Sequence, residues 1–126
     1  MYKVKGNITV NDKECPVTVV VENVSSVIEA VTKASDAGIH DVVFATLTKI
    51  KEIYHGKEEL CEAPWFEAIV RDSVDVSDGK TKRCQYKILI QSESIDDAHD
   101  RANNIVSQGY DMTLVSVKKT DFYQVL

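Results

Sequence analysis

Hydrophobic and polar positions follow the same order twice along this chain of 126 residues. In each copy, two segments rich in β-branched residues come first, then a stretch with helical spacing, and then another strand-like run. Apolar residues at positions i, i+3, i+4 and i+7 line one face of a helix, whereas short β-branched runs between turn residues form strands. Each copy therefore predicts the order β-β-α-β.

The strands of each copy are separated by recognisable turn chemistry. The first hairpin turns at Asn11 and Asp12, residue types that accept the left-handed backbone conformation, and the second turns at residues 77–80. The expected strands are residues 3–10, 16–21 and 42–50 in the first copy, and residues 65–71, 84–90 and 112–117 in the second.

Both helices carry a start signal. Ser26 is followed three residues later by Glu29, and Ser94 is followed three residues later by Asp97. A serine hydroxyl at this position accepts a hydrogen bond from a free amide of the first helical turn. A glycine follows each helix and supplies a stop. We expect one helix per copy.

These elements predict an α+β fold made of two tandem β-β-α-β repeats related by a pseudo-twofold axis. Each mixed or antiparallel sheet is covered by one helix, and a right-handed crossover makes the second and third strands parallel, with the first strand between them. We expect the first repeat at residues 1–54, a linker at 55–64 and the second repeat at 65–126, within one compact domain. The uncovered sheet faces must pack on the other copy or on a second chain.

Composition narrows the classes of function. The net charge of -5 opposes bulk attraction to nucleic acid. No apolar run is long enough to span a bilayer and no secretion signal precedes the first strand, so we expect a cytoplasmic protein without a membrane partner. The three cysteines show no C-x-x-C spacing, which favours reduced thiols.

The sequence offers no pattern of catalytic residues. No nucleophile motif, phosphate-binding glycine loop or zinc-protease motif is present. Asp96, His99 and Asp100 share one helical face and could hold a metal, but acidic residues are favoured near a helix N-terminus in any case. We therefore expect a non-enzymatic protein with no catalytic residue, no metal and no cofactor.

The first hypothesis for function is binding to a partner protein or to a second copy. Short β-β-α-β units leave sheet edges that can pair with other chains. The C-terminal segment is apolar and can complete the core, add a strand or dock on another protein. Its candidate interaction residues are Phe122, Tyr123, Val125 and Leu126.

The alternative hypothesis is binding of single-stranded nucleic acid along a basic strand. Trp65 and Phe66 could supply surfaces near this strand on which bases stack. These two rings could equally fill the core, and lysines on strands also protect sheet edges from unwanted pairing. The candidate residues are Lys80, Lys82, Arg83, Tyr86, Lys87, Lys118 and Lys119.

The second copy also carries a resemblance. Four features in order resemble a family of small proteins of unknown function from Bacteroidota and their crAss-like phages: the run Trp65-Phe66-Glu67, a hairpin, the pattern Ser94-x-x-Asp97-Ala98 and the run from Met112 to Lys119. The resemblance covers about residues 64–126. It implies an intracellular protein of a mobile element and carries no activity that could be transferred to a residue.

Overall fold

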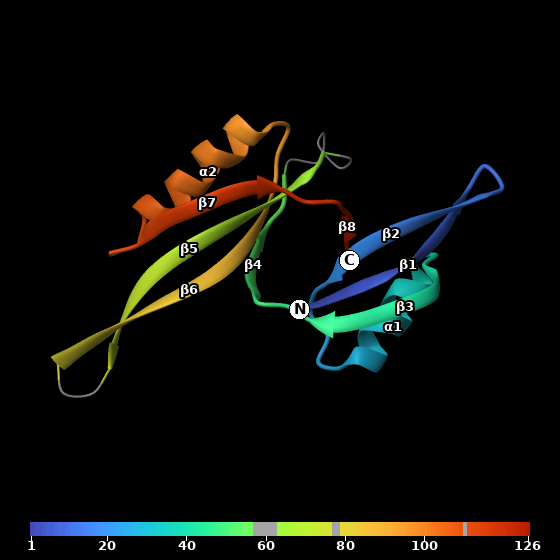
Figure 1. Ribbon diagram of the computed structural model, residues 1–126, viewed down its shortest axis with the longest axis horizontal. Coiled ribbons are helices and arrows are strands. Elements are labelled where there is room, and N and C mark those ends of the chain that lie inside the picture. The colour runs from blue at the N-terminus through green and yellow to red at the C-terminus, as the bar shows by residue number, and fades with distance from the viewer. Residues whose placement is uncertain (57–62, 77–78, 110) are drawn as a thin grey trace. The chain divides into compact units, whose positions relative to one another are not determined.

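The computed structural model describes residues 1–56, 63–76, 79–109 and 111–126. Within these residues the chain forms eight strands in two mixed four-stranded sheets, and two helices, which confirms the predicted α+β class (Figure 1). The elements are β1 Tyr2–Val10, β2 Lys13–Val21, α1 Val27–Asp36, β3 His40–Leu47, β4 Ile50–Tyr54, β5 Trp65–Val76, β6 Lys80–Gln91, α2 Ile95–Ser107, β7 Thr113–Lys119 and β8 Phe122–Val125.

The chain divides into two compact units with the same topology. The first unit contains residues 1–49 and 121–126, and the second contains residues 50–120. The strand order is β3-β1-β2-β8 in the first sheet and β4-β6-β5-β7 in the second. In each sheet the first strand of the repeat lies antiparallel between the second and third, as predicted. A fourth strand then pairs parallel with the second strand of the repeat.

Each fourth strand belongs to the sheet of the other repeat, so the two units do not have the predicted repeat boundaries. The run expected as one strand over residues 42–50 ends at Leu47, and Ile50 begins β4, which pairs with β6 of the second sheet. Residues 121–126, expected with the second repeat, pair with β2 of the first sheet. Leu47 pairs with Tyr2, the first residue of β1, and Thr48 then donates hydrogen bonds to the carbonyl of Met1 from its amide, at 2.9 Å, and from its hydroxyl, at 3.1 Å. The expected linker at 55–64 lies largely outside the described residues.

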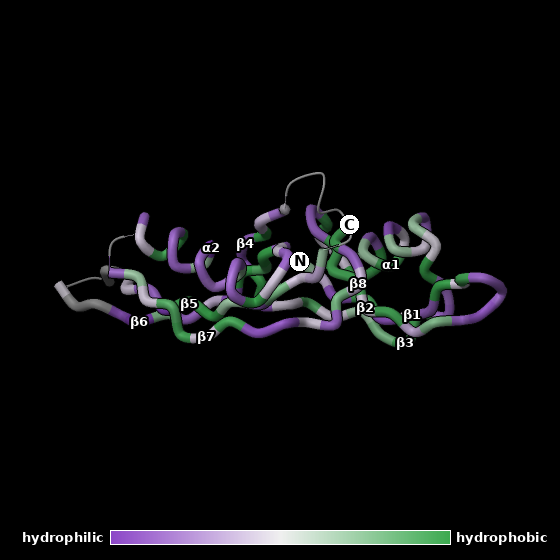
Figure 2. The backbone as a smooth tube through the Cα atoms, turned by 90° about the horizontal axis from the view of Figure 1, so that it is seen from above, coloured by the Kyte–Doolittle hydropathy of each residue, from purple (hydrophilic) through white to green (hydrophobic). Residues whose placement is uncertain are grey.

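Local signals account for the turns and helix starts. Asn11 and Asp12 have φ of 50° and 63°, the left-handed conformation predicted for the first hairpin turn, and Figure 2 shows hydrophilic residues at this tip. The Oγ atoms of Ser26 and Ser94 each accept a hydrogen bond of 3.1 Å, from the amides of Glu29 and Asp97. Both predicted helix caps are therefore confirmed. The second hairpin turn lies partly outside the described residues.

Each unit has its own hydrophobic core between one helix and one sheet. The helices contribute mainly alanines, Ala30 and Ala34 from α1 and Ala98 and Ala102 from α2, all fully buried. Small side chains let a helix backbone lie close to a sheet, where β-branched residues fill the remaining space. The sheets supply Val4, Val19 and Val21 to the first core, and Ala68, Val70, Ile88 and Ile90 to the second.

The C-terminal strand provides a test of how the first unit is built. The amide of Leu126 donates to the carbonyl of Val20 at 2.8 Å, the amide of Glu22 donates to the carbonyl of Leu126 at 2.9 Å, and the Leu126 side chain packs against the first core. Deletion of residues 121–126 should therefore lower the free energy of unfolding by about 2 kcal/mol or more, measured by urea denaturation. Tyr123→Ala is the control, because this side chain is exposed. Unchanged stability after the deletion would contradict a structural role for β8.

Candidate functional site

The edge strand β3 exposes apolar side chains. It forms one end of the first sheet and pairs with β1 (Figure 1). Residues 42–47 contain no charged residue, proline or glycine. Val43 is 73% exposed and Leu47 is 66% exposed, and Phe44 is also exposed. We call these three side chains the β3 edge.

The other sheet edges are protected in ways that residues 42–47 of β3 are not. Proteins blunt sheet edges with charged residues, above all lysine, or by keeping the edge strand short. The described edge strand β7 carries Lys118 and Lys119, and β4 carries Lys51 and Glu52. β8 has four residues, whereas β3 has eight. Among the described edge strands, β3 thus combines length with an uncharged exposed run.

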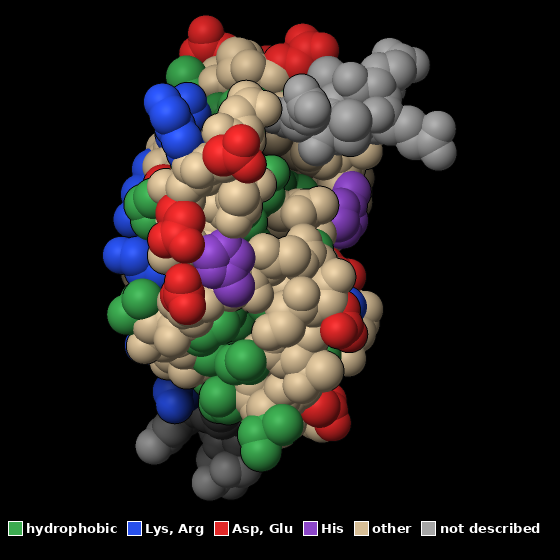
Figure 3. Space-filling model, turned by 90° about the vertical axis from the view of Figure 1, so that its right-hand side faces the viewer, with side chains coloured by type: hydrophobic (Ala, Val, Ile, Leu, Met, Phe, Trp, Pro, Cys, Tyr) green, Lys and Arg blue, Asp and Glu red, His purple; other side chains and the backbone are tan. Residues whose placement is uncertain are grey.

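Apolar residues of α1 extend the exposed surface next to β3. The Tyr2 hydroxyl donates a hydrogen bond of 3.4 Å to the carbonyl of Ser25, just before α1, and Tyr2 pairs with Leu47. The end of β3 and the first turn of α1 therefore lie beside the same tyrosine. Val27 and Ile28 in that turn are both exposed. In the space-filling view of Figure 3, hydrophobic side chains reach the surface among carboxylates and histidine.

The basic residues predicted on β6 are divided between its two faces. Side chains alternate along a strand, and Tyr86 packs against the core beneath α2. Lys82 therefore lies on the α2 side of the sheet, whereas Arg83 and Lys87 lie on the opposite side. The backbone of Lys80 belongs to β6, but its side chain is outside the described part of the structure. β6 does not present its cations as one continuous stripe.

A buried carboxylate engages two of the predicted cations. Glu67 on β5 is 7% exposed, and its Oε1 lies 3.5 Å from Lys87 Nζ and 3.6 Å from Lys118 Nζ. These are ion-pair contacts without hydrogen-bond geometry at Oε1. Lys119 pairs with Phe66, so its side chain lies on the other face from Lys118. Part of the positive charge is therefore balanced within the sheet and is less available to phosphates.

The aromatic residues that could have stacked on bases are covered. Trp65 and Phe66 are only 4% and 2% exposed, so the stacking surface predicted for them is not at the surface. The Tyr86 ring is partly buried, and Lys51 Nζ lies 4.5 Å from its centroid. Trp65 also makes an edge contact with His55, with ring centroids 5.4 Å apart. Of these aromatic side chains, Tyr86 packs against the core of the second unit, and Trp65 and Phe66 are buried.

Three roles were predicted for the C-terminal residues: to complete the core, to add a strand or to dock on another protein. The structure shows the first two. Phe122, Tyr123 and Val125 belong to β8 and thereby add a strand to the first sheet. Leu126 packs against the first core. Tyr123 keeps an exposed side chain at this edge.

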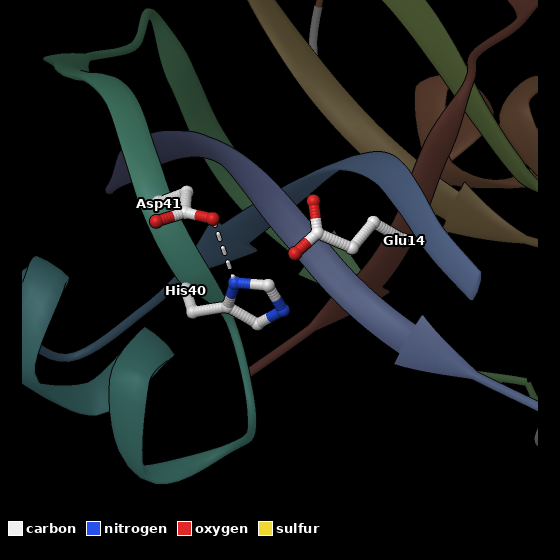
Figure 4. A group of neighbouring side chains, drawn as sticks. All are labelled: Glu14, His40 and Asp41. Atoms are coloured by element: carbon white, nitrogen blue, oxygen red, sulfur yellow. Dashed lines mark hydrogen bonds and ion pairs between the residues drawn. The ribbon is translucent and has the colours of Figure 1, made fainter. Parts of the chain in front are cut away.

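Three side chains that the sequence analysis did not select approach one another in the first unit. Glu14 on β2 and His40 and Asp41 on β3 have potential ligand atoms that all lie within 4.8 Å of one another (Figure 4). Among the described residues, this is the one such group of acidic, histidine or cysteine side chains, and it does not include His99. The His99 ring instead makes a 3.0 Å hydrogen bond with Asn103 on the same helix. Glu14 and His40 are brought together only by the pairing register of the strands. Their spacing along the sequence therefore does not indicate this group.

A tyrosine in the second unit gives the structure a pH dependence. A hydrogen bond to the Glu52 carboxylate, with burial, raises the pKa of Tyr54 from 10.0 to about 12. Burial, with Asp72 and Glu52 nearby, also raises the pKa of Tyr86. Because the folded state holds the Tyr54 proton more tightly than the unfolded state, this stabilisation is complete below pH 10 and is lost as pH rises toward about 12.

Urea denaturation of the wild type and of Tyr54→Phe over this alkaline range tests this account. The stability of the wild type should fall more steeply with pH than that of Tyr54→Phe, because the variant lacks the titrating phenol. Tyr123→Phe, which changes an exposed tyrosine, should keep the wild-type slope. Equal slopes for the wild type and Tyr54→Phe would contradict the assignment.

Comparison with known proteins places the chain in a family. The family model described as Domain of unknown function (DUF4494) matches residues 18–126 and so covers both helices and all strands from within β2 onward. No curated protein and no solved structure matches the chain significantly. Neither helix in the described ranges has the length and apolar character needed to cross a membrane. The chain belongs to the DUF4494 family of proteins with a domain of unknown function.

Proposed function

We propose that this protein is a non-enzymatic binding protein that acts through protein–protein contacts and forms a homodimer through the β3 edge. The observation that carries the proposal is the uncharged run at residues 42–47, with Val43 and Leu47 largely exposed on an edge strand. A long apolar edge is a template for uncontrolled pairing between chains. A specific partner that covers it would remove this hazard and would gain backbone hydrogen bonds.

A second copy is the simplest partner for such a strand. In a twofold arrangement the same residues contribute to both sides of the interface, so no further complementary surface is required. Two β3 strands would pair antiparallel, with their backbone amides and carbonyls bonded and the apolar side chains adjacent across the strands. The exposed residues Val27 and Ile28 of α1 would widen this contact beyond the two strands.

We further propose a cytoplasmic location and a phage-encoded origin. Cys15 and Cys84 are free thiols in the structure, which suits a reducing compartment. The resemblance of the second repeat to proteins of Bacteroidota and their crAss-like phages supports the origin.

Sedimentation velocity over a range of concentrations tests the dimer. The wild type should sediment as a dimer at high concentration and dissociate on dilution, and Val43→Lys should remain monomeric because it places a charge in the paired edge. Val115→Lys is the matched control, since Val115 is a 44% exposed valine on the edge strand β7. A wild type that is monomeric throughout, or a Val43→Lys variant that still dimerises, would contradict the proposal.

Single-stranded nucleic-acid binding is the alternative proposal, supported by the exposed Lys82 and Arg83 on β6. Because the cations of β6 lie on both faces of the sheet and the Trp65 and Phe66 rings are buried, we expect no salt-sensitive micromolar binding of single strands. Fluorescence anisotropy of labelled single-stranded DNA and RNA, at low and moderate salt, measures this directly. Binding that weakens when Lys82 and Arg83 are both changed to Glu, but not when Lys13 and Lys33 in the first unit are, would favour nucleic acid over the protein-binding function.

A further inference from the structure

We propose that Glu14, His40 and Asp41 form a binding site for a divalent transition-metal ion of the zinc type. This site is separate from the proposed dimerisation through the β3 edge and does not depend on it. Glu14 comes from β2, and the other two residues begin β3 (Figure 4). Their potential ligand atoms lie within 4.8 Å of one another, which is compact enough for one ion to be shared with small side-chain adjustments.

Strand register assembles the site. Glu14 pairs with Thr9 across the first hairpin, and His40 pairs with Asn7 on the other side of β1. Asn7 and Thr9 lie on the same face of β1, because side chains alternate along a strand. The residues opposite them, Glu14 and His40, therefore project from the same face of the sheet, on either side of the central strand.

A glycine and an unusual backbone angle bring β3 into position. A Cβ at Gly6 would lie 2.7 Å from Ile39 Cγ2 and 2.8 Å from the carbonyl oxygen of His40, so glycine permits the close approach of β1 to the start of β3. The pairing register of β1 with β3 shifts at this point. Asp41 has φ of 51°. In a regular strand, neighbouring side chains point to opposite faces. The positive φ of Asp41 departs from regular strand geometry, and this lets the Asp41 carboxylate lie beside the His40 ring.

The His40 ring is held by contacts at both nitrogens. Nδ1 lies 3.1 Å from Asp41 Oδ2, and Nε2 lies 3.1 Å from Thr9 Oγ1. In the tautomer whose Nε2–H donates to Thr9, the Nδ1 lone pair faces the carboxylate of Asp41. Histidine ligands of metals are commonly oriented by a hydrogen bond of this kind from the second ring nitrogen. Thr9 would thus act as a positioning residue, with Nδ1 as the ligand.

The donor set indicates the class of metal. One imidazole and two carboxylates carry two negative charges when the ring is neutral, which a divalent cation balances. Imidazole favours zinc and its neighbours among the transition metals, whereas magnesium and calcium prefer oxygen ligands alone. Glu14 and Asp41 are exposed and His40 is partly exposed, so water can complete the coordination. We assign no reaction to the site.

Isothermal titration calorimetry of the full chain with Zn²⁺ at neutral pH tests the assignment. The wild type should bind one Zn²⁺ per chain, and His40→Ala and Glu14→Gln should each abolish or greatly weaken this binding. Thr9→Val should weaken it by about tenfold or more through loss of the orienting hydrogen bond. An excess of Mg²⁺ should not compete.

His99→Ala is the matched control, because His99 is an exposed histidine beside Asp96 and Asp100 on α2. It should bind Zn²⁺ as the wild type does. Circular dichroism establishes that each variant is folded, and Glu14→Gln, which changes an exposed side chain, keeps the test valid if His40→Ala is unstable. No saturable binding to the wild type, unchanged binding in folded Glu14→Gln, or loss of binding in His99→Ala would overturn the proposal.

Discussion

The parallel pairing of one additional strand with each repeat's second strand is the interaction on which both units depend. A β-β-α-β repeat supplies only three strands, and its second strand would otherwise be an edge. β8 covers β2 in the first sheet, and β4 covers β6 in the second. β2 and β6 contribute the deeply buried residues Val19, Val21, Ile88 and Ile90, so this cover lies directly beside the two cores. The short fourth strands thus cover the strands that carry these buried residues.

The two units share a topology but differ in what their surfaces offer. In the second unit, charged residues stand at the described edges and the Glu67 carboxylate balances two lysines from neighbouring strands. In the first unit, β3 presents uncharged apolar side chains, and the start of the same strand carries His40 and Asp41. One architecture thus occurs twice with different exposed residues, because the buried alanines and branched apolar residues that form each core do not fix the residue types at the surface.

Features that depend on neighbouring residues were predictable from the sequence, whereas those that depend on pairing between distant strands were not. The capping serines and the Asn11–Asp12 turn act over a few residues, and their geometry is as expected. The division of the run from Val42 to Ile50 into two strands has no distinct signal in the sequence, because the two polar residues at the break, Thr48 and Lys49, are types that also occur within strands such as β6. Alternation along β6 is a local property that follows from the sequence once the strand is assigned, and it places the adjacent residues Lys82 and Arg83 on opposite faces.

The exchange of fourth strands means that neither unit corresponds to one repeat of the chain, because each contains a strand that follows the third strand of the other repeat. A half-length protein ending after β4 would contain a strand whose place is in another copy's sheet, and its own sheet would lack one. Two such proteins could complete each other by mutual strand exchange, as in domain-swapped dimers. Joining two copies in one chain makes that exchange intramolecular, so that completing both sheets no longer depends on the concentration of the protein.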